Sequence, residues 1–193
     1  AAVNDSYAAL GWVWENARKI GGAPSKIAVI GDSAGGNLAT VMTILARDRN
    51  GPEIQCQVLY YPVTTMVDTS FDSREYFMGQ HGRHFVLSRE LMKEIKTKYL
   101  AGTSDRLPTL SPLYAKLNRE LPPALVITAQ CDPLRDEGNL YAKRLEQAGI
   151  PTQYKEYEGM IHGFILLYPA IRSGKKAIKQ TDKFLQDQFS PSS

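Results

Sequence analysis

The segment that most constrains the fold is residues 27–36, with the sequence Ile-Ala-Val-Ile-Gly-Asp-Ser-Ala-Gly-Gly. Its short apolar run, residues 27–30, is typical of a buried β-strand. Apolar side chains then recur at helical spacing, at Leu38, Val41, Met42 and Leu45. The segment therefore predicts a strand, a sharp turn and a helix, with Ser33 at the turn in a Gly-x-Ser-x-Gly pattern.

The predicted turn explains the residues that surround the serine. A reversal this tight brings strand and helix very close together, so we expect that side chains at Gly31 and Gly35 would clash. The strained backbone would hold the Ser33 hydroxyl at the head of the helix, where the first amide groups have no intrahelical acceptor. Ser33 is thus a candidate nucleophile, and the Ala34 N–H is a candidate donor to a developing oxyanion.

Length and charge limit the classes of protein. The 193 residues are the size of one domain, and the formal net charge of +3 is too small to indicate a nucleic-acid partner. No apolar run approaches the roughly 20 residues that span a bilayer, and no signal-peptide pattern opens the sequence. Cys56 and Cys131 lie in or beside apolar runs, which favours buried free thiols. We therefore expect a cytoplasmic protein without a membrane span.

Strand and helix patterns alternate along most of the chain. An amphipathic helix is predicted over residues 1–20, with an inward face of Tyr7, Leu10, Trp14 and Ala17. Further strands are predicted over residues 56–61, 124–129 and 152–157, the last polar enough for a sheet edge. Helices are predicted over about 136–148 and from Pro169 to about Phe189, the latter with Ile171, Ile178 and Leu185 inward. This order predicts an α/β fold: a mostly parallel sheet with helices on both faces.

Residues 63–121 interrupt this alternation. They combine short polar stretches with scattered aromatic residues and one helix that begins after Ser88 as its N-cap. We expect an insertion that forms a cap or lid over the site. Its side chains Phe71, Phe77 and Phe85 are candidates to line a substrate pocket, although packing within the cap is the commoner fate of such residues.

An activated serine needs a base and a group that orients the base. His81 and His84 lie in the polar insertion, in a stretch whose composition predicts an exposed loop, so neither is favoured as the base. His162 follows the fourth predicted strand, at the carboxyl end of the sheet, where functional residues of open α/β sheets gather. A structural role, such as capping a helix, is the alternative for this histidine.

The candidate acid is Asp132, which directly follows the third predicted strand. Asp136 and Glu137 are alternatives, but they fall in the first turn of the next helix, where acids commonly complement the helix dipole. A turn or N-cap role is the structural alternative for Asp132. Ser33, Asp132 and His162 each follow a different strand, in the chain order of an α/β-hydrolase triad.

Three segments resemble motifs of the hormone-sensitive-lipase-like esterases of the α/β-hydrolase superfamily. Residues 31–39 resemble the nucleophile motif, residues 132–138 the acid motif and residues 162–164 the histidine motif, and Ser-Pro-Leu at 111–113 resembles the segment before the acid strand. The resemblance covers the carboxyl-terminal two-thirds of such an enzyme. It implies Ser33 as nucleophile, Asp132 as acid, His162 as base and Ala34 as an oxyanion donor. The implied substrate is a small carboxylic ester with a short or medium acyl chain, cleaved through an acyl-enzyme.

One departure from the family is large. The chain lacks the His-Gly-Gly-Gly motif that supplies the other oxyanion donors, together with the family's first strands and the amino-terminal part of its cap. Each lost donor costs roughly 100- to 1,000-fold in rate. We therefore expect residues 1–193 to be a partial catalytic domain, completed by an amino-terminal segment or a companion chain and inactive without the missing oxyanion segment. A short esterase with a substitute donor is the alternative.

Other functions remain open at this stage. The hydrolase fold also serves small-molecule binding proteins, which lack a working triad, and serine peptidases, which need room for a peptide. A phosphate-binding loop is a weaker alternative, because residues 31–36 lack the Lys-Ser/Thr ending of such loops. No metal or cofactor is expected, since His and Cys show no ligand spacing. The resemblance also implies a homodimer that pairs through the charged final strand, although charged edges also prevent such pairing.

Overall fold

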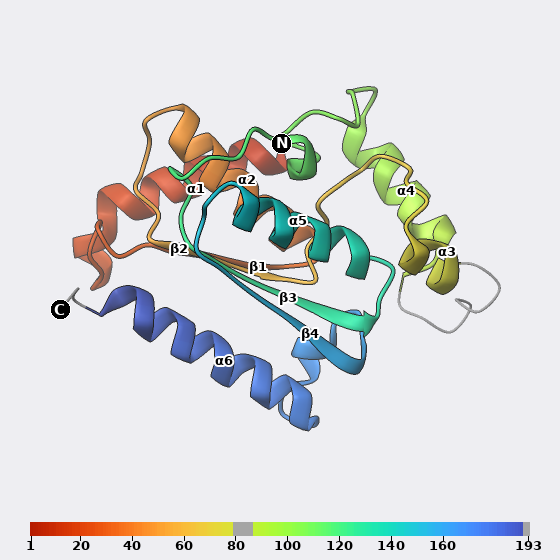
Figure 1. Ribbon diagram of the computed structural model, residues 1–193. Helices are drawn as coiled ribbons and strands as arrows, with labels where there is room; N and C mark the ends of the chain where they lie inside the picture. The colour runs from red at the N-terminus through yellow and green to blue at the C-terminus, as the bar shows by residue number, and fades with distance from the viewer. Residues whose placement is uncertain (79–86, 191–193) are drawn as a thin grey trace.

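A four-stranded sheet in the order β1-β2-β3-β4 organises the protein (Figure 1). The computed structural model describes residues 1–78 and 87–190. The strands are β1 (Ala28–Asp32), β2 (Cys56–Tyr60), β3 (Ala124–Cys131) and β4 (Thr152–Ile161). Every neighbouring pair is parallel. The predicted α/β class and parallel sheet are confirmed, and all carboxyl ends of the strands lie at one end of the sheet.

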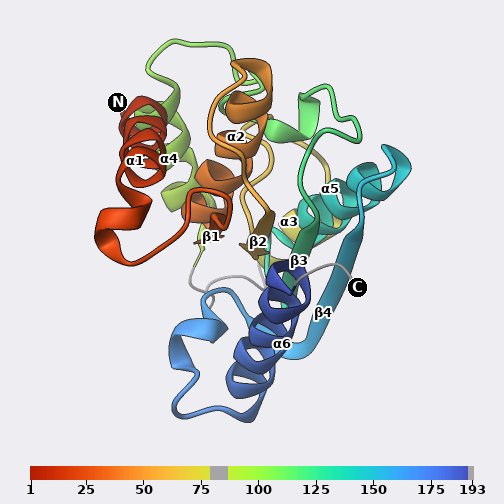
Figure 2. The same ribbon diagram turned by 90° about the vertical axis from the view of Figure 1, so that its left-hand side faces the viewer.

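Helices cover both faces of the sheet. On one face lie α2 (Ala34–Asp48) and α5 (Arg135–Gln147), and along the other lies α6 (Arg172–Phe189). Figure 2 shows β1 and β4 at opposite edges of the sheet, with α6 on the side away from α2. Strand residues alternate between the two layers: Leu59 and Val126 pack with α2 and α5, whereas Val58, Leu125 and Ile127 pack towards α6. The central strands β2 and β3 are therefore buried on both faces.

The first helix packs mainly on α2. It comprises α1 (Ala2–Asn16) and a 3₁₀ turn (Ala17–Ile20), and Leu10 joins Val41 and Leu45 in one apolar cluster. Trp14 was predicted to face inward, but this prediction was wrong, since 44% of it is exposed. Val13 occupies the inward position, because it continues the three- and four-residue spacing from Leu10.

Helix α6 also differs from its prediction. It begins at Arg172 and not at Pro169, after a 3₁₀ turn, η4 (Phe164–Leu167). Its buried residues are Gly174, Ala177, Thr181 and Phe184, whereas Ile178, predicted to point inward, is 37% exposed. A Cβ on Gly174 would lie 2.6 Å from Tyr168 Cα. This close approach between the turn and the helix fixes which face of α6 meets the sheet.

Both cysteines are free thiols. Cys56 is buried as predicted, and its burial raises the pKa of the thiol to about 11, whereas Cys131 is only half-buried.

Among the helices within residues 1–78 and 87–190, none has the length and apolar character that crossing a bilayer requires.

The segment between β2 and β3 carries α3 (Asp72–Met78), α4 (Arg89–Leu100) and a 3₁₀ turn, η3 (Pro112–Tyr114). The Ser88 side chain accepts a hydrogen bond from the Leu91 N–H at 3.1 Å, which confirms Ser88 as the N-cap of α4. Figure 1 shows α3 and α4 beyond the end of the sheet at which the arrowhead of β3 lies.

A buried ion pair fastens α3 to α5. Glu137 is fully buried, and its carboxylate accepts hydrogen bonds from the Arg74 guanidinium and from the N–H groups of Thr64 and Thr65. Arg74 also donates to the carbonyl oxygens of Thr65 and Val67. Complete burial raises the pKa of Glu137, because desolvation outweighs the attraction of the guanidinium.

A second link caps both helices reciprocally. The Ser73 N–H donates to Asp136 Oδ2 at 2.8 Å, and the Asp136 N–H donates to Ser73 Oγ at 3.3 Å. The Ser73 hydroxyl also donates to the carbonyl oxygen of Pro133 at 2.9 Å. Although burial acts in the opposite direction, hydrogen bonds from Arg135 and Ser73 hold the pKa of Asp136 below its usual value. The acids at the start of α5 thus bind α3 and the loop after β2, in addition to any effect on the helix dipole.

Replacement of Arg74 with Met should destabilise the protein by about 3–5 kcal/mol at neutral pH, because it leaves the Glu137 carboxylate buried without its counter-charge. In the variant, no guanidinium opposes the effect of burial, which holds the pKa of Glu137 above its unfolded value of about 4.3. The loss relative to wild type should therefore be largest at neutral pH and should shrink as the pH falls and Glu137 becomes protonated.

Urea unfolding at pH 7 and near pH 4 measures both effects. Arg89→Met is the matched control, since Arg89 pairs with Glu75 at an exposed site and its loss should cost less than about 1 kcal/mol. An equal loss for Arg74→Met at both pH values would contradict the role assigned to Glu137.

Candidate active site

Ser33 lies between the last residue of β1 and the first residue of α2, with φ 54° and ψ −116°. A positive φ is strained for a residue with a side chain, so the surrounding contacts must hold it. The Ser33 N–H donates to the Tyr60 carbonyl at 2.9 Å, and the Ser33 carbonyl accepts from the N–H groups of Asn37 and Val63. The predicted strand, sharp turn and helix are confirmed.

The glycines around Ser33 differ in how much space a side chain would have at each position. A Cβ on Gly31 would lie 2.1 Å from the Gly35 carbonyl oxygen, so no side chain fits there. At Gly35 itself the nearest atom would be 3.8 Å away, and the prediction that a side chain would clash at this position was wrong. The second crowded position is Gly36, where a Cβ would lie 2.8 Å from Pro62 Cβ. Gly35 contributes its backbone to the close approach, whereas its own side-chain position is open.

His162 directly follows β4, and its side chain lies between the side chains of Ser33 and Asp132. His162 Nε2 is 2.9 Å from Ser33 Oγ, and His162 Nδ1 is 2.7 Å from Asp132 Oδ2. Asp132 is fully buried, and its other carboxylate oxygen accepts from the Leu134 N–H at 2.8 Å. With a proton on Nδ1, the imidazole donates to Asp132 and accepts from the serine hydroxyl. Three residues distant in the sequence thus meet at the carboxyl end of the sheet.

The other candidate acids are directed elsewhere. The hydrogen bonds found for Asp136 and Glu137 within the described residues join them to Arg135, to α3 and to the loop after β2. Of the sequence-based candidates for the acid, Asp132 is the one whose carboxylate contacts His162.

Ala34 is the first residue of α2, so its N–H belongs to the group that has no intrahelical acceptor. A negative charge that develops beside Ser33 would also lie at the positive end of the helix dipole. The backbone thus supports the predicted donor role of Ala34.

The predicted pocket aromatics have packing contacts. Phe71 packs on the core, with the Arg74 guanidinium 5.9 Å from its ring centroid. Phe77 is buried and meets Tyr76 edge to face at 4.9 Å. Phe85 lies outside the described residues, as do His81 and His84 of the same segment. A substrate-binding role for Phe71, Phe77 and Phe85 stays a prediction.

Sequence reasoning missed Tyr61. This residue is fully buried, has φ 35°, and its ring centroid lies 4.7 Å from that of His162. Burial, followed by the negative charges of Asp32 and Asp132, raises the pKa of Tyr61 above its usual range. Tyr61 could have been found from the sequence by its position directly after a strand, because that end of the sheet also carries His162.

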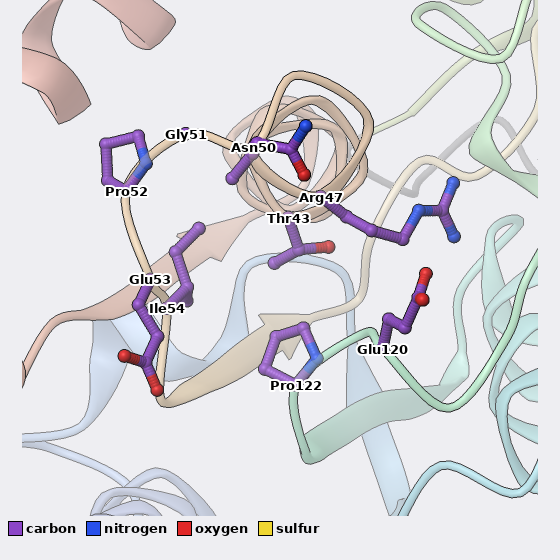
Figure 3. A pocket seen from close by; sticks show the side chains of 10 residues that line it. Thr43, Arg47, Asn50, Gly51, Pro52, Glu53, Ile54, Glu120 and Pro122 are labelled. Atoms are coloured by element: carbon purple, nitrogen blue, oxygen red, sulfur yellow. The ribbon is translucent and has the colours of Figure 1, made fainter.

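A cavity of about 320 Å³ lies at the opposite end of the sheet (Figure 3). Its lining includes the carboxyl end of α2 and the residues that precede β2 and β3, among them Arg47, Glu53, Ile54 and Pro122. Because all strands are parallel, this end is remote from the strand ends that carry Ser33, Asp132 and His162. The cavity is therefore not part of the candidate active site.

The comparisons with known proteins agree with this geometry. Residues 1–166 match the family described as alpha/beta hydrolase fold, and the chain belongs to this family, within its hormone-sensitive-lipase-like esterases. Carboxylesterase NlhH of Mycobacterium tuberculosis is 44% identical over 178 residues, which are 88% of this chain and 54% of the relative. An ethyl acetate hydrolase of Pseudomonas putida is 34% identical over 97% of this chain and 58% of the relative.

A solved structure shows the same fold. A hyperthermophilic esterase from the archaeon Pyrobaculum calidifontis superimposes with a TM-score of 0.90 at 42% identity, over 97% of this chain and 61% of that structure. The chain thus spans between one half and two thirds of the length of the relatives that it matches.

Gly31→Ala should destabilise the protein by about 1–3 kcal/mol or prevent folding, because the added methyl group meets backbone that cannot move aside. Gly35→Ala is the matched control: it has space and lies within a helix, where alanine is favoured by up to about 1 kcal/mol. Soluble yield and urea unfolding measure the difference. Equal stabilities of the two variants would contradict the assignment of Gly31 as the point of closest approach.

Proposed function

We propose that this chain is the carboxyl-terminal part of a serine carboxylesterase in which Ser33, His162 and Asp132 form the catalytic triad. The observation that carries the proposal is the pair of hydrogen bonds on His162, 2.9 Å to Ser33 Oγ and 2.7 Å to Asp132 Oδ2. Relatives named carboxylesterase and esterase support the reaction class.

In the proposed reaction, Ser33 Oγ forms a bond to the ester carbonyl carbon while its proton moves to His162 Nε2. Asp132 holds the imidazole in its productive tautomer and stabilises the imidazolium. The Ala34 N–H donates to the oxyanion. His162 then gives its proton to the departing alcohol as the carbon–oxygen bond breaks. Water cleaves the acyl-enzyme by the same steps, which releases the carboxylic acid and restores the serine.

The proposed substrate is a small ester with a short or medium acyl chain. One relative is named an ethyl acetate hydrolase, which supports a small substrate. Residues 63–121 would act as a cap. Helix α3 is fastened beside the acid loop, residues 132–134 after β3, by the contacts of Ser73 with Pro133 and Asp136. Within this cap, Phe71, Phe77 and Phe85 are the proposed lining of the acyl pocket.

We further propose that additional polypeptide, in the same or a separate chain, completes the site. Within the described residues, β1 pairs with β2 alone, and Ile30 at this edge is 48% exposed. An apolar groove beside it is lined by residues of α1, β1 and α2, among them Leu10, Val13, Val29 and Leu38. A strand added at this edge would cover the groove and bring the remaining oxyanion donors.

Ser33→Ala should lower kcat for a p-nitrophenyl ester by at least about 1,000-fold and abolish labelling by a fluorophosphonate, because both reactions need the serine oxygen. Intact mass and peptide mapping locate the label. Ser25→Ala, at an exposed serine, is the control and should retain both activities. The 193-residue chain should label more slowly than a longer protein that contains it.

Three outcomes would count against the proposal. Labelling or hydrolysis that persists in Ser33→Ala would exclude Ser33 as the nucleophile. Tight binding of esters by the complete protein without turnover would indicate a binding protein. A preference for amide over ester substrates would indicate a peptidase.

A further inference from the structure

Tyr61 lies beside His162, although it comes from a different strand. It follows β2, whereas His162 follows β4, so the contact passes across the end of β3 between them. The two ring centroids are 4.7 Å apart, and the ring planes are inclined by 57°. The Tyr61 ring also meets Phe164 edge to face at 5.9 Å, and Phe164 in turn contacts Tyr157 at 5.2 Å. His162 thus belongs to a cluster of packed aromatic rings.

The backbone holds Tyr61 firmly in this position. Its N–H donates to the Ile127 carbonyl of β3 at 2.6 Å, and its side chain is fully buried. Its φ of 35° is unfavourable for a bulky residue, so the surrounding structure maintains a strained conformation at this position. Strain of this kind is commonly found where a side chain must be held in one orientation for function.

We propose that Tyr61 is a positioning residue for His162: its ring holds the imidazole in line between Ser33 and Asp132 and stabilises the imidazolium formed during acyl transfer. The inference rests on the proposed function. The proton that leaves Ser33 Oγ gives His162 a positive charge. The 4.7 Å between the two ring centroids is within the roughly 6 Å at which a cation over the face of an aromatic ring is attracted by its π electrons. The attraction is strongest away from water, and His162 is itself buried.

The ring, and not the hydroxyl, carries this role. The Tyr61 hydroxyl is buried, and its contact with the Ile165 backbone falls short of normal hydrogen-bond geometry. Burial keeps the phenol neutral, since it raises the pKa of Tyr61. The hydroxyl therefore supplies neither a proton nor a charge to His162, and phenylalanine should replace tyrosine without loss.

The test compares Tyr61→Phe with Tyr61→Leu in the longest form of the protein that contains this chain. Tyr61→Phe should keep kcat within about twofold and should be about as stable as wild type, because the hydroxyl that it removes has only a weak contact with the Ile165 backbone to lose. Tyr61→Leu should lower kcat about tenfold, within the roughly 2- to 30-fold that a cation–ring contact supplies, while KM stays within about twofold. Rates are expressed per active site, counted by fluorophosphonate labelling.

Tyr141→Leu is the matched control for the loss of a buried ring. Tyr141 is also fully buried, but it lies on α5 in the apolar layer on the other face of the sheet. This variant removes a buried ring and also the 2.7 Å hydrogen bond between the Tyr141 hydroxyl and Thr40 Oγ1, so it should lose at least as much stability as Tyr61→Leu and should keep kcat per active site. The low-field proton resonance of His162 Nδ1 should shift or broaden in Tyr61→Leu and stay unchanged in Tyr141→Leu.

The outcomes separate this inference from the proposed function. A wild-type protein that is not labelled at Ser33 would overturn both. Normal labelling with equal kcat values for Tyr61→Leu and wild type would overturn the role of Tyr61 alone. A Tyr61→Phe variant as slow as Tyr61→Leu would show that the hydroxyl matters and would overturn the role of the ring. A raised KM with unchanged kcat would place Tyr61 in substrate binding instead.

Discussion

The close contact between the backbones of Gly31 and Gly35 is the constraint on which the geometry of the site depends. It allows α2 to start directly at the end of β1, which holds Ser33 at a positive φ with its hydroxyl at the carboxyl end of the sheet. The neighbouring contact between Gly36 and Pro62 fixes the path by which the chain leaves β2. These two tight contacts thus set the positions of Ser33 and Tyr61, which both contact the His162 ring.

The short segment 132–137 has two roles at once. Its first residue, Asp132, turns towards His162, while Asp136 and Glu137 bind α3 and the loop after β2. Because these side chains share one turn of backbone, the position of the candidate acid is coupled to the docking of the segment between β2 and β3. Substitutions in α3, far from the serine in sequence, are therefore expected to act on the site through the acid loop.

The sequence predicted most of the sheet and of the candidate site because their signals are local. A strand, a tight turn and a helix within residues 27–45 can be recognised from spacing alone, and Asp132 and His162 each follow a strand. The features that were missed depend on packing contacts that leave no mark in the spacing of residues along the chain. The inward face of α6 is set by Gly174 against Tyr168, and no periodicity in the sequence marks the pairing of Arg74 with Glu137 or the contact of Tyr61 with His162.

The order of the strands has a consequence for biosynthesis. A nascent chain completes β1, α2 and β2 first, but the partners of Arg74 and Ser73 lie beyond β3, at the start of α5. Until the ribosome has released that part of the chain, the guanidinium of Arg74 has no carboxylate to neutralise and α3 has no surface on which to rest. We therefore expect the segment between β2 and β3 to become ordered late, after β3 has paired with β2. Pairings between distant parts of a chain are the slow steps of folding.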